Sequence, residues 1–200
     1  MRRILAALLC LGLVQLYAYD PAHLKKLLAD QECIGCDLRG ADLRDIDFSG
    51  WDLSKSDFSH ANVSRSIFVM ADLNDANLSD ANATQSVFWK GTMERADLTR
   101  IHAQGASFKG THLNGSNLSF ADLRATKSWK ANFTGALLRK TDFTDAELGD
   151  AKFIHNDLRS SKLSRTLLWR TYFSDVKMTK AQCAHAKKEE ALLDSNVTCR

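Results

Sequence analysis

The chain has 200 residues, of which 44% are hydrophobic, and its 27 Lys and Arg against 24 Asp and Glu give a formal net charge of +3 at pH 7. This near-neutral total excludes a protein that is strongly acidic or strongly basic as a whole. The charge is nevertheless uneven, because residues 19–100 carry 9 basic and 14 acidic side chains whereas residues 101–200 carry 16 and 10. The distribution predicts a charge dipole along the chain, although two ordinarily solvated surfaces would give the same counts.

Residues 1–18, MRRILAALLCLGLVQLYA, have the layout of a secretory signal peptide. Arg2 and Arg3 form its basic start, an apolar run covers 4–16, and Ala18 is a small residue suited to cleavage. The apolar run is short for a bilayer span, so a membrane anchor is the less favoured interpretation. We therefore expect a periplasmic or secreted protein with no integral membrane span in its mature chain, whose net charge after cleavage is +1.

Residues 20–31, DPAHLKKLLADQ, predict a short amphipathic helix. Asp20 suits the N-cap and Pro21 the first turn, while Leu24, Leu27 and Leu28 form one apolar face. Together with the cysteines that follow, residues 19–35 are expected to cap the start of the next segment.

Four cysteines lie outside the predicted signal peptide: Cys33, Cys36, Cys183 and Cys199. The CIGC segment at 33–36 has the spacing of redox and zinc sites, but no thioredoxin-like pattern surrounds it, and the other two cysteines lie near the far end of the chain. Three connectivities are open from the sequence. We favour structural Cys33–Cys36 and Cys183–Cys199 disulfides, with a thiol-redox role for CIGC as an alternative.

A repeat of five residues organises the chain from 36 to 183, as in ADLRD, ADLND, ANLSD and ADLRA. Stepping by five from Leu38 to Cys183 gives thirty central positions without an insertion, and 23 of them hold Leu or Phe. Two residues earlier, 25 of the thirty positions hold Ala, Ser, Thr, Gly or Cys. A period of five matches neither an α-helix nor an ordinary alternating strand.

This pattern resembles the pentapeptide-repeat family, whose motif is A(D/N)LXX. The resemblance implies an all-β fold, a right-handed quadrilateral parallel β-helix with one pentapeptide per side and twenty residues per coil. It also implies that the central residue and the small residue two before it point inward. A twenty-residue coil predicts stacked columns in the core, formed by Phe48, Phe68, Phe88 and Phe108, by Phe133, Phe153 and Phe173, and by Leu78, Leu98, Leu118, Leu138 and Leu158.

The open ends of a parallel β-helix need capping, since their backbone groups are unpaired. Residues 184–195, AHAKKEEALLDS, predict a second helix, with Leu192 and Leu193 available to cover the last coil. The region 184–200 is thus expected to be a C-terminal capping helix.

Trp89, Trp129 and Trp169 are spaced by forty residues, and each follows a central position. They should therefore point outward along one side of the rod, about 10 Å apart, because forty residues make two coils. Apolar residues occupy further outward slots on this side, and a basic residue follows each Trp. The predicted interaction face comprises Ile67, Val69, Met70, Val87, Trp89, Lys90, Trp129, Lys130, Leu167, Trp169 and Arg170.

This composition is typical of a contact surface. We expect a non-catalytic exported scaffold that binds a protein partner or a second copy of itself. Carbohydrate stacking, a membrane surface, and outward apolar residues that the repeat merely tolerates are the alternatives. Other outward apolar residues, such as Phe120, Leu137 and Tyr172, are scattered.

No motif predicts an enzyme, a cofactor or a metal site. The histidines fall in different columns, and the many Asp residues follow the repeat. The resemblance suggests one further function, that of the quinolone-resistance proteins, which mimic DNA and bind a topoisomerase. That function requires a cytoplasmic address and a strongly acidic surface, so the predicted signal peptide and the near-neutral charge disfavour it. We expect no nucleic acid partner.

Overall fold

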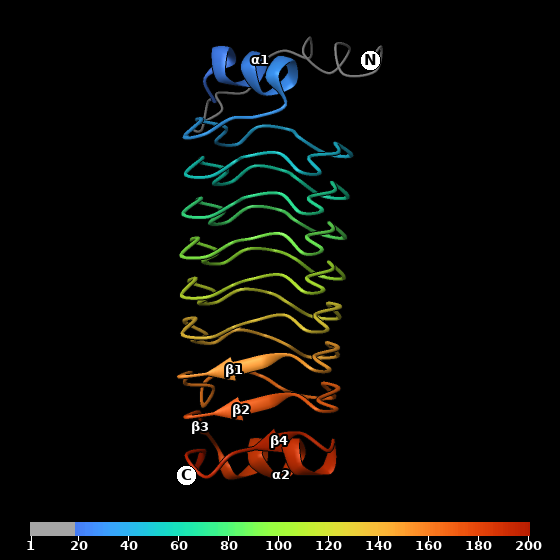
Figure 1. The fold of residues 1–200 in the computed structure, drawn as a ribbon, viewed down its shortest axis with the longest axis vertical. Coiled ribbons are helices and arrows are strands. Elements are labelled where there is room, and N and C mark those ends of the chain that lie inside the picture. Colours follow the sequence, from blue (N-terminus) through green and yellow to red (C-terminus); the bar gives the residue numbers. More distant parts are fainter. Residues whose placement is uncertain (1–18) are drawn as a thin grey trace.

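The computed structural model describes residues 19–200, which form one parallel β-helical rod with a helix at each end (Figure 1). The predicted signal peptide lies outside the described residues and stays a prediction. The two helices are α1 (Pro21–Asp30) and α2 (Lys180–Lys188). The extended strands are short, and they are β1 (Lys152–Ile154), β2 (Tyr172–Ser174), β3 (Lys177–Met178), β4 (Leu192–Leu193) and β5 (Thr198–Cys199).

Parallel pairing at a spacing of twenty residues runs along the rod up to the pairing of β3 with β5, where Lys177 pairs with Thr198. It begins with the bridge of Asp37 to Asp57 and continues to the pairing of Lys152 in β1 with Tyr172 in β2. The strands form two parallel sheets with the orders β1-β2-β4 and β3-β5. This register confirms the predicted coil of four pentapeptides.

The core is a stack of inward-pointing side chains, as the repeat predicts. In the first phenylalanine column the ring centroids are 4.7 to 4.9 Å apart, and in the second they are 4.8 and 5.2 Å apart. The small inward residues also bond between coils: the Ser66 hydroxyl donates to the Leu43 carbonyl (2.7 Å) and that of Thr141 to the Leu118 carbonyl (2.8 Å). Because these hydroxyls are buried, each such bond satisfies a group that would otherwise be costly to bury.

Helix α1 occupies the segment in which the sequence predicts a helix. The Asp20 side chain accepts a hydrogen bond from the backbone N–H of Ala22 (2.8 Å), as an N-cap should. Leu27 is fully buried against the first coil, and Leu24 packs beside it. Leu28, which the sequence places on the same apolar face, is instead 39% exposed.

The C-terminal cap differs from the prediction. Helix α2 begins four residues earlier than expected, because Thr179 and Gln182 form a capping box that starts it at Lys180. Leu192 and Leu193 are not helical but form β4, which pairs with β2 and continues one side of the rod. The predicted helix over 184–195 is therefore wrong in its bounds, since the repeat gives way to the helix at 180 and the chain returns to the coil afterwards.

Candidate interaction face

The three Trp lie in one column on the side that we call the Trp face. This face consists of residues 46–50, 66–70, 86–90, 106–110, 126–130, 146–150 and 166–170. Trp89 and Trp169 are 41% and 46% exposed, and Trp129 is half-buried. The backbone holds the column in place, because the N–H of Met70 donates to the Trp89 carbonyl (2.9 Å) and that of Asp150 donates to the Trp169 carbonyl (3.1 Å). The structure thus places all three Trp outward on one side.

The indole of Trp129 lies over Gly149, which occupies the same column one coil later. A Cβ atom added at Gly149 would fall 2.5 Å from Cε3 and 2.7 Å from Cη2 of that ring, so the ring fills the space of the missing side chain. Its Nε1–H donates to Glu147 (2.8 Å), and its centroid is 6.3 Å from that of Trp169, at an angle of 52°. These two rings are therefore closer than the 10 Å that two coils predict, because Trp129 leans toward the following coil.

Cations flank the two more exposed rings. The ammonium groups of Lys90 and Lys109 lie 5.2 and 5.9 Å from the Trp89 ring centroid, and the Arg170 guanidinium lies 5.2 Å from that of Trp169. Such cation–π contacts contribute about 0.5–1 kcal/mol each at exposed sites. They favour arrangements in which positive charge lies beside the two rings.

Aliphatic side chains border the Trp column at both ends. Ile67 and Met70 are 39% and 64% exposed toward the N-terminal end, and Leu167 is 49% exposed toward the C-terminal end. Val69 and Val87 are half-buried between their neighbours. Lys130 and Lys90 are exposed at corners of the coil, where each adopts a left-handed backbone with φ of 60° and 55°. The predicted residues thus share one face, with exposed aliphatic groups toward its two ends and the Trp rings along it.

The four cysteines form two disulfides at opposite ends of the rod. Cys33 pairs with Cys36 beside α1, and Cys183 of α2 pairs with Cys199 of β5. Cys33 and Cys36 are 0% and 2% exposed. A redox site needs an accessible thiolate, so this burial favours a structural role.

Neither a metal centre nor a membrane span was found in the described part of the chain. Within residues 19–200, no cluster of three or more His, Cys, Asp or Glu is arranged to hold a metal ion. Over the same range, no helix combines the length and the apolar character that crossing a membrane requires.

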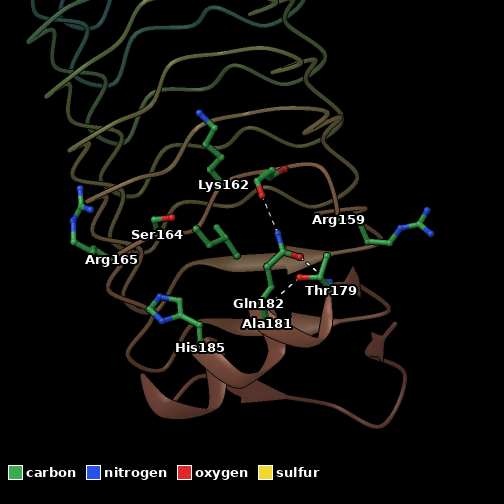
Figure 2. Close-up of a pocket in the computed structure, with 10 residues that line it drawn as sticks. Arg159, Lys162, Ser164, Arg165, Thr179, Ala181, Gln182 and His185 are labelled. Carbon is green, nitrogen blue, oxygen red and sulfur yellow. Dashed lines mark hydrogen bonds between the residues drawn. The ribbon is translucent and has the colours of Figure 1, made fainter.

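An open cavity of about 370 Å³ lies where α2 meets the rod (Figure 2). Its polar groups are already bonded: the Gln182 amide donates to the carbonyls of Leu158 (2.7 Å) and Ser161 (2.9 Å), and His185 Nε2 lies 2.9 Å from the Thr166 carbonyl oxygen. Arg165, on its rim, is paired with Asp145. The groups that line the cavity therefore attach the C-terminal cap to the rod. The five-residue repeat alone did not predict these contacts.

The coil geometry defines a pentapeptide-repeat solenoid, and the comparisons with known proteins agree. Residues 41–118 match the family profile described as "Pentapeptide repeat region", and residues 131–170 match the one described as "Pentapeptide repeats (8 copies)". Together these matches cover more than half of the chain, which therefore belongs to the pentapeptide-repeat proteins, a family that is generally non-catalytic.

The chain is similar to several solved pentapeptide-repeat structures. A trypsin-treated form of QnrB1, a plasmid-mediated fluoroquinolone resistance protein, is 21% identical over 74% of this chain and 78% of that chain, with a TM-score of 0.50. HetL, which is involved in heterocyst differentiation regulation in the cyanobacterium Nostoc, is 21% identical over 84% and 81%, with a TM-score of 0.30. A protein of the Arabidopsis thaliana thylakoid lumen is 25% identical over 79% and 82%, with a TM-score of 0.22. No curated protein matches the chain. The likeness to QnrB1 shows the fold.

Proposed function

We propose that this protein is an exported, non-catalytic binding module that holds a protein partner against the Trp face. The observation that carries the proposal is the strip of exposed Trp and aliphatic side chains on one side of the rod. Aromatic residues are enriched where proteins bind each other, and such a strip is costly to leave in water.

The rigidity of the rod supports the same function. The backbone groups of the Trp face bond from coil to coil, and the rings are held by contacts with Gly149, Glu147 and neighbouring cations. A preformed surface loses little conformational entropy on binding, which favours affinity.

Export is the second part of the proposal. It rests on the signal-like residues 1–18 and on the two disulfides, which persist in oxidising compartments. N-terminal sequencing of the protein from its native cells should show a mature chain that begins at Tyr19. A chain that retains residues 1–18 in the cytoplasm would contradict export.

The two alternatives from the sequence are less well supported. A DNA mimic presents a strongly acidic surface, whereas the Trp face is basic over residues 86–130. The similarity to QnrB1, at 21% identity, concerns the fold. A thiol-redox function would need Cys33 or Cys36 to be accessible, and both are buried.

The experiment is an affinity capture that compares the wild type with a variant carrying Trp89→Ser, Trp129→Ser and Trp169→Ser. A matched control carries Phe120→Ser, Leu137→Ser and Tyr172→Ser, which removes three exposed apolar side chains from other sides. A differently tagged second copy is present, so that self-association is also detected. Circular dichroism verifies that each variant folds.

We expect the Trp variant alone to lose a protein that the wild type and the control retain. If all three proteins capture the same set, the Trp face is not the binding surface. If the second copy alone is lost, the face mediates self-association instead.

A further inference from the structure

The arginines of the rod follow a pairing rule. In one arrangement an Arg bonds to the Asp two residues before it, as Arg44 does to Asp42 (2.6 Å). In the other, a corner Arg bonds to the Asp twenty residues earlier, on the preceding coil. Nine of the eleven arginines in residues 19–200 are paired with a carboxylate in one of these ways, and they are Arg39, Arg44, Arg65, Arg95, Arg100, Arg124, Arg159, Arg165 and Arg170. Most of the arginine charge of the described chain is thus paired within the molecule.

The lysines do not follow this rule: among residues 19–200 only Lys26 and Lys162 form an ion pair, and four of the other lysines lie together on the Trp face. They are Lys90, Lys109, Lys127 and Lys130, and none forms an ion pair within 4.0 Å among the described residues. The positions twenty residues earlier hold Met70, Trp89, Ser107 and Gly110 in place of an Asp. The segments 86–90, 106–110 and 126–130 contain no acidic residue at all, so this part of the face carries four positive charges and no negative one.

The nearest acidic residues along the face have other partners. Glu147 pairs with Lys127 in the β-bridge register, but its carboxylate accepts the hydrogen bond of Trp129 Nε1. Asp150 follows Lys130 by one coil, but it bonds to the Arg170 guanidinium (3.0 Å). No carboxylate of the described residues therefore pairs with the four ammonium groups, two of which lie beside the Trp89 ring, and their positive charge is available to an external partner.

The order of groups along the face limits what that partner can be. Ile67 and Met70 lie at one end, Leu167 and Trp169 lie at the other, and the four lysines lie between them together with Trp89 and Trp129. A sugar or nucleic acid chain could stack on Trp, but it has no apolar groups for the exposed aliphatic side chains at the ends. A lipid surface would favour one continuous apolar patch with cations around it, whereas four cations here separate the exposed aliphatic side chains of the two ends.

We propose that the partner of the Trp face is a polypeptide segment with acidic residues in its middle and apolar residues at its two ends. This rests on the proposed function and specifies the chemistry of the partner. The distance from Met70 to Leu167 spans five coil steps, about 24 Å, which an extended segment of roughly seven residues would cover. The side chains of the Trp face recognise this segment, because the backbone groups of the face are already hydrogen-bonded between coils.

A selection from a random twelve-residue peptide display library tests the chemistry directly. The baits are the wild-type protein of residues 19–200, a variant with Lys90→Gln, Lys109→Gln, Lys127→Gln and Lys130→Gln, and the Trp→Ser variant described above. A matched control carries Lys55→Gln, Lys140→Gln, Lys152→Gln and Lys177→Gln, which neutralises four lysines outside the Trp face. An enriched peptide is then synthesised and its affinity is measured for each protein at low and high salt.

The expected peptides have an acidic centre between apolar ends. Their affinity should fall about tenfold in the Trp-face lysine variant, should fall with salt, and should be unchanged in the control. Peptides that need the Trp but carry no acidic residues would overturn this inference and leave the proposed function standing. The absence of any peptide that prefers the wild type to the Trp variant would count against both.

Two further probes address the other classes of partner. Heparin and vesicles of phosphatidylcholine with phosphatidylserine are titrated against the same four proteins. Lysine-dependent binding of either one, together with no enrichment of acidic peptides, would overturn the inference in favour of a polysaccharide or a membrane.

Discussion

Trp129 and Gly149 form a ring-over-glycine contact that joins two successive coils on the Trp face. The contact places the Trp129 ring beside Trp169 and directs its Nε1–H to Glu147. One oxygen of the Glu147 carboxylate is thus engaged by the indole, and Glu147 forms no ion pair with Lys127, its partner in the β-bridge register. The absence of a side chain at Gly149 therefore affects both the shape of the surface and the hydrogen bonding of Glu147.

Gly149→Leu should displace the Trp129 ring. The new side chain would occupy the space of the ring, and overpacking of this kind costs about 1–3 kcal/mol. We expect the indole N–H signal of Trp129 in NMR spectra to shift and to exchange faster with solvent, because its bond to Glu147 is lost. Ser49→Leu changes the same column at an exposed position and is the control. An unchanged Trp129 signal in Gly149→Leu would mean that the ring does not depend on the glycine.

Phe88→Ala should be strongly destabilising. Phe88 is fully buried between Phe68 and Phe108, each with its ring centroid 4.9 Å away. Truncation of a buried Phe costs about 3–5 kcal/mol, because it removes burial and leaves a cavity. The free energy of unfolding from denaturant titration measures the loss. Phe120→Ala, at a position that is 44% exposed, should lose about 1 kcal/mol or less. Equal losses would contradict the stacked core.

Loss of the Cys183–Cys199 disulfide should loosen the C-terminal cap. The bridge joins α2 to β5 over a sequence separation of 16, for which chain entropy predicts a stabilisation of about 3 kcal/mol. In Cys183→Ser/Cys199→Ser, hydrogen exchange should accelerate in α2, β4 and β5 more than in the central coils. Cys33→Ser/Cys36→Ser opens a much shorter loop and should leave the C-terminal cap unchanged. Uniform acceleration along the rod would show that the bridge does not act locally.

Acid should destabilise the rod through its Asp–Arg pairs. A hydrogen bond from Arg65 lowers the pKa of Asp45 below its ordinary value of 3.8, and Arg165 does the same to the pKa of Asp145. Since these pKa values are lower in the folded state, the stabilisation is present above the unfolded value and is lost as the pH falls through the folded one. The melting temperature should be nearly constant from pH 7 to about 5 and should fall below about pH 4.

Asp45→Asn combined with Asp145→Asn should make that decrease less steep. The pairs are exposed, so each contributes little by itself, and the slope with pH is the informative quantity. A pH profile with the same slope in wild type and variant would assign the acid effect to other carboxylates.

The repeat made most of the fold predictable from local residues. Each central Leu or Phe with its small partner recurs every five residues, so the period alone predicts which side chains point inward and which columns stack. The C-terminal cap was less predictable, because the segment up to Cys183 keeps the repeat pattern while Thr179 and Gln182 start a helix within it. Two local signals compete there, and the contacts of Gln182 with the last coil favour the helix.

The sequence by itself determined the coil, its register and the side on which the Trp lie, because every coil bonds its backbone to the next in the same way. Only the tertiary structure decided which neighbouring residues the long outward side chains contact. Trp129 leans over Gly149, Glu147 binds Trp129 rather than Lys127, and Asp150 binds Arg170. These choices depend on residues twenty or forty positions apart that compete for the same space and the same hydrogen bonds, and no local pattern records the outcome of that competition.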